Sequence, residues 1–126
     1  MSNAADHDDK RYDLIERTAV FGENVIEMLK HVPETKLTGS LIDQLCRAAS
    51  SVGANYIEAD DAVSRKDFRY RIRICRKEPK ECKHFLRMMA KAHPPIADQA
   101  RTLWKEAKEL NLIFGSIYRK TQEERA

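Results

Sequence analysis

A helical pattern is clearest in FRYRIRICRKEPKECKHFLRMM, residues 68–89 of a chain of 126 residues. Apolar residues and one proline recur there at alternating intervals of four and three, the period of one face of an α-helix. They are Phe68, Ile72, Cys75, Pro79, Cys82, Leu86 and Met89. Ser64 and Asp67 precede the pattern with the spacing of a helix N-cap, and Pro94 follows it. We therefore expect a helix from Ser64 to near His93.

Pro79 lies inside this expected helix. A proline in a helix interior removes one backbone donor, clashes with the preceding turn and costs about 3 kcal/mol. Two outcomes fit: a kink, or a break after which Glu78 caps a new helix that begins at Pro79. Because the apolar register stays in phase from residue 72 to residue 86, the pattern favours the kink.

Three further segments have the same period. The first runs from Asp9 to His31, the second begins after a cap at Thr38 or Ser40, and the last opens at Pro95. Their apolar stripes are Leu14, Thr18, Phe21, Val25, Met28 and Val32; Leu41, Leu45, Ala48, Val52, Asn55 and Ala59; and Ile96, Ala100, Leu103, Ala107, Leu110, Phe114 and Ile117. Helices with short connections pack antiparallel to their neighbours. The sequence thus predicts an all-α fold, an up-down-up-down antiparallel four-helix bundle over residues 10–120, with a disordered tail at 1–9 and a C-terminal tail at 121–126.

The composition excludes several classes of protein. With 42% apolar and 34% charged residues, the chain is neither disordered nor collagen-like. Three cysteines are too few for a disulfide framework, and no apolar run approaches the roughly 18 residues of a membrane span. Asp6, Asp8 and Asp9 stand where a signal peptide needs positive charge. We therefore expect a cytoplasmic protein without a membrane association.

The charge is unevenly distributed along the chain. Residues 1–61 hold six basic and twelve acidic residues, a net charge of −6, whereas residues 62–91 hold eleven and three, a net charge of +8. Residues 92–126 add +1, which gives +3 overall. A basic block beside an acidic one is typical of a nucleic-acid surface, or of segments that attract one another within a fold or between subunits.

The basic residues of the 64–93 helix have the spacing of its apolar stripe, shifted by one residue. This ridge consists of Arg69, Arg73, Arg76, Lys80, Lys83 and Arg87, and Arg65, Lys66, Lys77 and Lys91 broaden it. It is about 27 Å long by helical rise, enough to meet several phosphates of RNA or DNA. Tyr70 alone lies near it in a position to stack on a base. The alternative is a solvated face that pairs with acidic residues of neighbouring helices.

The second helix combines small residues with a polar pair. Between Cys46 and Ala54 it is almost entirely alanine, serine and glycine, which allows close approach by more than one neighbouring helix. Asn55 and Glu58 lie one turn apart on this mostly apolar segment and need partners, for which an Arg or Lys of the third helix is suited. We interpret the pair as part of a hydrogen-bond network that fixes the register, buried or at a subunit interface.

Signs of catalysis are weak. The chain has no His-x-x-x-His and no Cys-x-x-Cys, so a zinc site is not expected. Glu81 and His84 have the Glu-x-x-His spacing of di-iron bundles, with Glu27 and Glu58 as candidate partners, but that motif occurs once where such bundles need it twice. The sequence favours a non-enzymatic protein with no metal and no cofactor, and a di-metal carboxylate enzyme is the weakest alternative.

Several motifs identify a known family. The stretch SVGANYIEA (51–59), followed by SRKDF (64–68), ICRKE (74–78) and Glu81, resembles the four-helix-bundle proteins encoded in intervening sequences of bacterial 23S ribosomal RNA genes. The resemblance extends from about Tyr12 to Arg119 and implies a helical bundle that assembles into a homopentameric ring. Related proteins accompany reverse transcriptases in diversity-generating retroelements and bind nucleic acid. The family's motif positions fall here on Asn55, Glu58, Glu78 and Glu81, with a structural rather than catalytic role.

The residues and the resemblance lead to one functional hypothesis. We expect a non-enzymatic, oligomeric bundle, most simply a pentamer, that binds RNA or DNA phosphates through the ridge on its third helix. The alternative is a protein–protein adaptor without nucleic-acid binding, whose partner is another subunit or a protein such as a reverse transcriptase.

Overall fold

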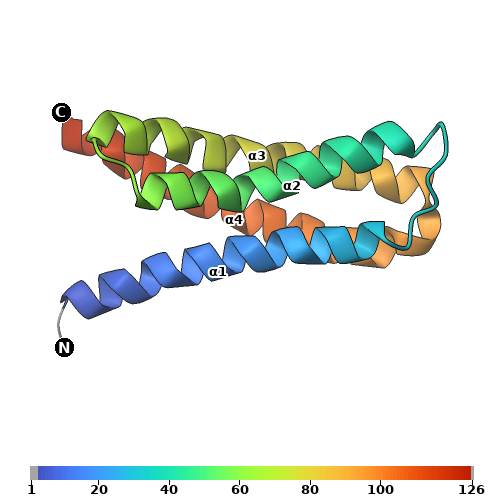
Figure 1. Ribbon diagram of the computed structural model, residues 1–126, viewed down its shortest axis with the longest axis horizontal. Coiled ribbons are helices and arrows are strands. Elements are labelled where there is room, and N and C mark those ends of the chain that lie inside the picture. Colours follow the sequence, from blue (N-terminus) through green and yellow to red (C-terminus); the bar gives the residue numbers. More distant parts are fainter. Residues whose placement is uncertain (1–2, 126) are drawn as a thin grey trace.

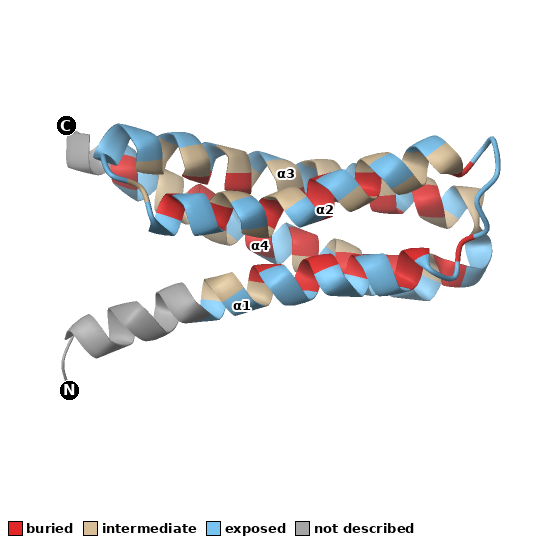
Figure 2. Ribbon diagram, in the orientation of Figure 1, coloured by how far each residue is buried: buried red, intermediate tan, exposed pale blue. Residues whose placement is uncertain are grey.

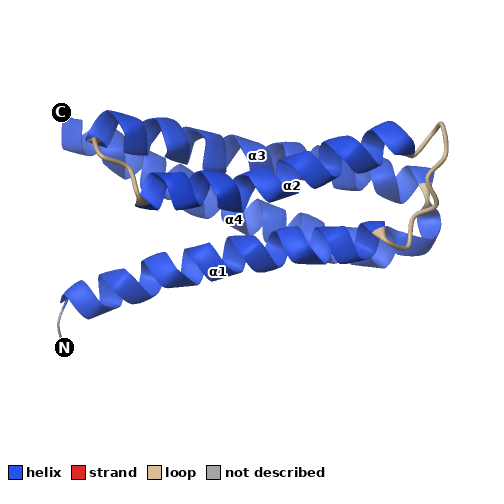
Figure 3. Ribbon diagram, in the orientation of Figure 1, coloured by secondary structure: helices blue, strands red, loops and turns tan. Residues whose placement is uncertain are grey.

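The computed structural model describes the backbone of residues 3–125 and the side chains of residues 13–122. Four long helices follow one another: α1 (Asn3–Leu29), α2 (Gly39–Asp60), α3 (Arg65–Ala92) and α4 (Ala97–Arg125). A short 3₁₀ turn, η1 (Pro94–Ile96), precedes α4, and no strand occurs in the described backbone (Figure 3). Successive helices run in opposite directions, so α1 begins and α4 ends at the same end of the bundle (Figure 1). The predicted up-down-up-down four-helix bundle is confirmed.

The helices differ in how they are surrounded. α3 packs along its length against both α2 and α4, whereas α1 packs against α2 and much less against α4. α1 and α3 therefore lie diagonally opposite each other. In Figure 1 α1 also diverges from α2 toward its N-terminus.

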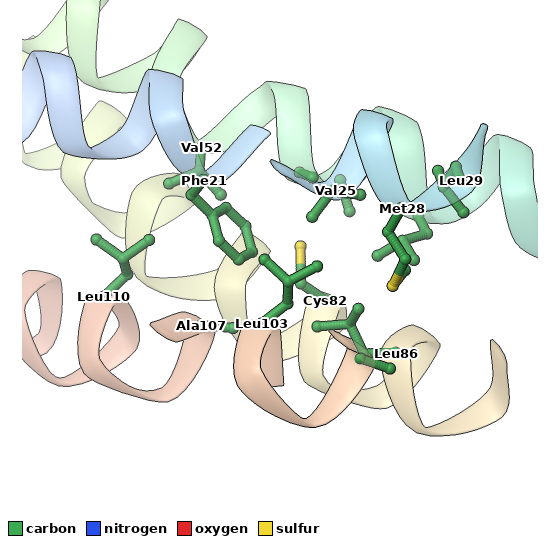
Figure 4. Close-up of a cluster of buried hydrophobic side chains, with 14 of the residues drawn as sticks. Phe21, Val25, Met28, Leu29, Val52, Cys82, Leu86, Leu103, Ala107 and Leu110 are labelled. Carbon is green, nitrogen blue, oxygen red and sulfur yellow. The ribbon is translucent and has the colours of Figure 1, made fainter. Parts of the chain in front are cut away.

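The core follows the predicted apolar stripes. Figure 2 shows buried residues along the inner side of each helix, and Figure 4 shows side chains of all four helices pointing toward one another. Phe21, Val52, Leu86 and Leu110 are among the residues that form this core. None of the described helices carries an apolar segment long enough to cross a membrane.

The N-termini of α3 and α2 differ in whether the predicted residue caps the helix with its side chain. Ser64 caps α3 as predicted, because its side chain accepts a hydrogen bond from the backbone N–H of Asp67 at 3.1 Å. Thr38 occupies the N-cap position of α2 but does not cap it with its side chain. Its hydroxyl instead donates to the carbonyl of Pro33 at 2.6 Å and thereby closes the preceding loop.

Three helix boundaries in the structure differ from those that the sequence pattern predicts. The last helix does not open at Pro95, because the two prolines form η1 and α4 starts at Ala97. α1 begins at Asn3, earlier than Asp9, since no Gly or Pro interrupts the segment between them. Helix thus covers residues 3–9 of the predicted disordered tail, while residues 1–2 lie outside the described part. At the other end, α4 extends to Arg125, through most of the predicted tail at 121–126, and residue 126 is not described.

Pro79 does not interrupt α3. The helix is continuous from Arg65 to Ala92, so the alternative of a break is excluded, and the Pro79 side chain is buried in the core. Asn111 of α4 donates from Nδ2 to the backbone carbonyl of Arg76 at 2.7 Å, within one turn of the proline. A side chain that reaches the backbone here compensates for part of the hydrogen bonding that a proline disturbs.

Candidate nucleic-acid interface

The outward side of α3 is uniformly basic. From Tyr70 to Lys91 its exposed residues include no acidic side chain. With Lys66 they form one row at alternating spacings of four and three, which we call the basic face: Lys66, Tyr70, Arg73, Lys77, Lys80, His84, Arg87 and Lys91. The row spans about 37 Å by helical rise. It shares Arg73, Lys80 and Arg87 with the ridge predicted from the sequence.

The other three members of the predicted ridge lie at the contact between α3 and α4. Arg69, Arg76 and Lys83 are half-buried. The guanidinium carbons of the two arginines lie 5.3 Å and 4.6 Å from the centroid of the Tyr118 ring, and the ammonium of Lys83 lies 5.4 Å from that of Trp104. These distances are typical of cation–π contacts.

Arg69 makes one further contact with α4, because its Nε donates to the hydroxyl of Thr121 at 3.2 Å. The predicted ridge of six residues is therefore not uniformly exposed. Its members alternate between packing against α4 and facing solvent. The cause lies in two aromatic rings of α4 that are distant in sequence, over which long basic side chains lie.

Asn55 has the partner predicted for it. Arg71 of α3 donates from Nη1 to Oδ1 of Asn55 at 3.0 Å. The amide nitrogen of Asn55 in turn donates to the carbonyl and the hydroxyl of Ser51, at 2.9 Å and 2.8 Å. Glu58, one turn further along α2, is exposed in the single chain. Its predicted place at a subunit interface stays a prediction.

Glu78 and Glu81 lie further along α3 than Arg71, the partner of Asn55, and Glu78 is half-buried near Arg47 of α2. Burial raises the pKa of Glu78 above its ordinary value, and the neighbouring carboxylate of Glu81 raises it further, against the opposing charges of Lys77 and Arg47. Glu81 is only loosely paired, with the Lys77 ammonium at 3.9 Å. The four motif residues therefore do not form a single network within the described chain.

The residues of the di-metal alternative are not brought together. Glu27 is exposed and pairs with Lys30 at 3.2 Å, and His84 belongs to the exposed basic face. Among the side chains at 13–122, no three His, Cys, Asp or Glu residues gather in a metal-binding cluster. Burial raises the pKa of both Cys75 and Cys82 to about 12, so these thiols stay protonated and unreactive at neutral pH.

Comparisons with known proteins agree with this architecture. The sequence model of a family described as "23S rRNA-intervening sequence protein" matches residues 10–123. A crystal structure from Bacteroides thetaiotaomicron, described as a protein with unknown function from the S23 ribosomal protein family, superposes with a TM-score of 0.74. The two chains are 23% identical over 87% of this chain and 98% of the other, which shows a shared fold. No curated protein matches the sequence.

Proposed function

The chain belongs to the family of 23S rRNA-intervening sequence proteins, and from that premise we propose that it is a non-enzymatic protein that binds RNA or DNA through the basic face of α3. One observation carries the proposal. The exposed residues of α3 from Tyr70 to Lys91 include five Lys or Arg and no acidic residue. A row of exposed cations on one helix attracts the phosphate backbone of a nucleic acid.

The alternative of a solvated face that pairs with neighbouring acids has less support. Within the basic face, the one ion pair found among described residues joins Lys77 to Glu81 at 3.9 Å. Arg73, Lys80 and Arg87 have no such pair. Their charges are therefore available to a ligand at no cost to folding, and release of counterions makes phosphate binding steeply salt-dependent.

A matched pair of variants tests the proposal. Arg73→Glu/Lys80→Glu reverses two charges of the basic face, and Lys36→Glu/Lys105→Glu reverses two exposed charges on the α1–α2 loop and on α4. We expect the first variant to lose most binding to labelled RNA at about 50 mM salt and the second to keep most of it, as measured by fluorescence anisotropy. Equal losses would show that overall charge alone matters, and wild type without binding would remove the proposal.

We also propose that the chain assembles with copies of itself, most simply as the pentamer that the family resemblance implies. Ala48 and Ala49 of the small-residue segment are buried within the chain, whereas Ser50 and Ala54 are exposed beside Ile57, which is 54% exposed. A row of small and apolar residues on the outside of α2 suits a close approach by a helix of another subunit. Light scattering at micromolar concentration measures the mass, and a monomeric mass would contradict this proposal.

Glu58 provides a sharper test of that interface. It is exposed in the single chain, so Glu58→Ala should leave the stability of an isolated subunit unchanged. If Glu58 lies at the interface, the variant lowers the oligomeric mass at a given concentration. An unchanged melting temperature and mass would show that Glu58 has no structural role.

The same measurements examine the adaptor alternative. Exposed acids on α1, Asp13, Glu16, Glu23 and Glu27, have a charge complementary to the basic face. If Arg73→Glu/Lys80→Glu dissociates the oligomer, the basic face contacts another subunit. The three cysteines are free thiols, as is usual in a reducing compartment, and this agrees with the cytoplasmic location that we propose.

A further inference from the structure

We infer that the basic face selects double-stranded over single-stranded nucleic acid and contacts the phosphates of the duplex rather than its bases. This inference rests on the proposed function and specifies its ligand. It follows from the cations that cover the nearby aromatic rings, from the shape of the surface and from its positive charge.

The aromatic rings near the basic face are already covered. Proteins that bind single strands use exposed aromatic rings on which successive bases stack. Here Trp104 lies beneath Lys83 and Lys108, whose ammonium groups are 5.4 Å and 6.0 Å from its centroid. Tyr118 lies beneath Arg69 and Arg76. Each ring thus has a cation of the protein where a base would stack.

The remaining aromatic residues provide few further rings on which a base could stack. Tyr70 and His84 carry the two rings of the basic face. The guanidinium of Arg71 lies 5.4 Å from the Tyr70 ring centroid, and the His84 ring meets that of Phe85 edge to face with centroids 5.5 Å apart. Tyr56 and Phe114 are buried against each other with centroids 5.6 Å apart. Among the side chains at 13–122, therefore, no series of open rings follows the basic row, and a single strand would lose the stacking that normally stabilises its complexes.

The surface is the outward side of one helix rather than a groove. α3 is one continuous helix, and α2 and α4 pack on either side of it. A row of Lys and Arg side chains along one helix can lie along the sugar–phosphate backbone and neutralise its charge without reading the bases. The basic row therefore lies against the sugar–phosphate backbone. This contact predicts little dependence on base sequence.

A duplex also matches the charge of the row better. It presents one phosphate charge per about 1.7 Å of axis, twice the density of either strand alone, and its phosphates are already fixed in space. A flexible single strand must be ordered against the rigid row, which costs conformational entropy that no stacking compensates. DNA and RNA duplexes share this phosphate chemistry, so both are tested.

The experiment compares a labelled strand of about 20 nucleotides that cannot pair with itself, alone and annealed to its complement, in DNA and in RNA, at about 100 mM salt. We expect the intact wild-type protein to bind each duplex at least about tenfold more tightly than the single strand. The salt slope should be about 0.9 per phosphate contact for the duplex. Tyr70→Ala should change either affinity less than about twofold, because no base stacks on this ring.

The outcomes separate the two proposals. Equal or tighter binding of the single strand, or a loss of single-strand affinity in Tyr70→Ala by about tenfold, would overturn the preference for duplexes and leave nucleic-acid binding intact. Absence of binding to all four probes would instead remove the proposed function itself. Preference for one duplex only, DNA or RNA, would keep the inference and identify its source.

Discussion

α1 and α3 have the same apolar period but opposite surroundings. α3 lies between α2 and α4, and its outward side is basic. α1 packs closely against α2 but has few contacts with α4. Its exposed side is acidic and carries Asp13, Glu16, Glu23 and Glu27. A cleft of about 1020 Å³ opens where α1 diverges from the other three helices. Its lining includes Leu14 of α1, Phe68 of α3 and Ile117 of α4. Amphipathic pattern alone therefore does not determine how much a helix contributes to stability.

Truncation of one leucine on each helix measures that difference. Leu86 on α3 is 1% exposed, whereas Leu14 on α1 is half-buried beside the cleft. Leu86→Ala should lower the free energy of unfolding by about 3–5 kcal/mol, because it removes buried methyl groups and leaves a cavity. Leu14→Ala should cost about 1 kcal/mol. Urea denaturation followed by circular dichroism measures both, and equal losses would show that α1 is packed as tightly as α3.

The four-helix bundle could be predicted from the sequence because the signals that indicate its helices are local. The apolar stripes, the Ser64 cap and the Pro94 stop each depend on neighbours a few residues away. The position of α1 is different. Its stripe has the same spacing of four and three as that of α3, and nothing in it indicates that contact with α4 is sparse.

The candidate site was only partly predictable for a similar reason. A spacing of four and three selects a row of basic residues but does not say which row faces solvent. The rings of Tyr118 and Trp104 decide this, because they hold Arg69, Arg76 and Lys83 against α4. Such contacts join residues 21 to 49 positions apart, which no local pattern reveals.

Two glycines test how closely the helices approach. A Cβ atom at Gly53 of α2 would lie 3.2 Å from the Thr18 hydroxyl of α1, which is held by its hydrogen bond to the Leu14 carbonyl at 2.7 Å. A Cβ at Gly115 of α4 would lie 3.5 Å from Arg119 and 3.7 Å from Arg76, at flexible side-chain atoms. Gly115→Ala should therefore stabilise the fold by about 0.5–1 kcal/mol through helix propensity.

Gly53→Ala should instead destabilise the fold by about 1 kcal/mol, since the contact with Thr18 outweighs the same gain in propensity. Thermal melts of the two variants give the comparison. A stabilising Gly53→Ala would mean that α1 shifts easily, and Gly53→Ala in a Thr18→Ala background distinguishes that case from a true steric contact.

An ion pair between two described side chains links α1 to α4. Arg17 donates from Nε and Nη2 to the two carboxylate oxygens of Glu106, both at 2.8 Å, and this hydrogen bonding raises the pKa of Arg17. Both side chains are partly exposed, so water weakens their attraction. A double-mutant cycle with Arg17→Met and Glu106→Gln should give a coupling free energy of about 0.5–1 kcal/mol. This coupling should shrink in about 1 M salt, which screens the two charges. The looser Lys77–Glu81 pair on α3 is the control, with at most about 0.5 kcal/mol. Coupling no larger than the control would show that this pair does not hold α1 in place.

The smallest expected effect lies at Glu78, where α3 is packed against α2. Because its pKa is raised in the folded protein, the folded state holds this proton more tightly than the unfolded chain does. Stability is therefore lost as the pH rises from the ordinary pKa of the carboxyl through the raised value, and the full cost is present at neutral pH. Glu78→Gln removes that cost and should be more stable than wild type at pH 7, a difference that vanishes at acidic pH below both pKa values.

Since water screens the partly exposed carboxylate of Glu78, the gain in stability should stay below about 0.5 kcal/mol. Urea denaturation at both pH values measures it, with Glu34→Gln in the exposed α1–α2 loop as the control for the loss of one charge. A variant less stable than wild type at pH 7 would mean that the attraction of Lys77 and Arg47 outweighs the burial of Glu78, and that the α2–α3 contact is held by charge as well as by packing.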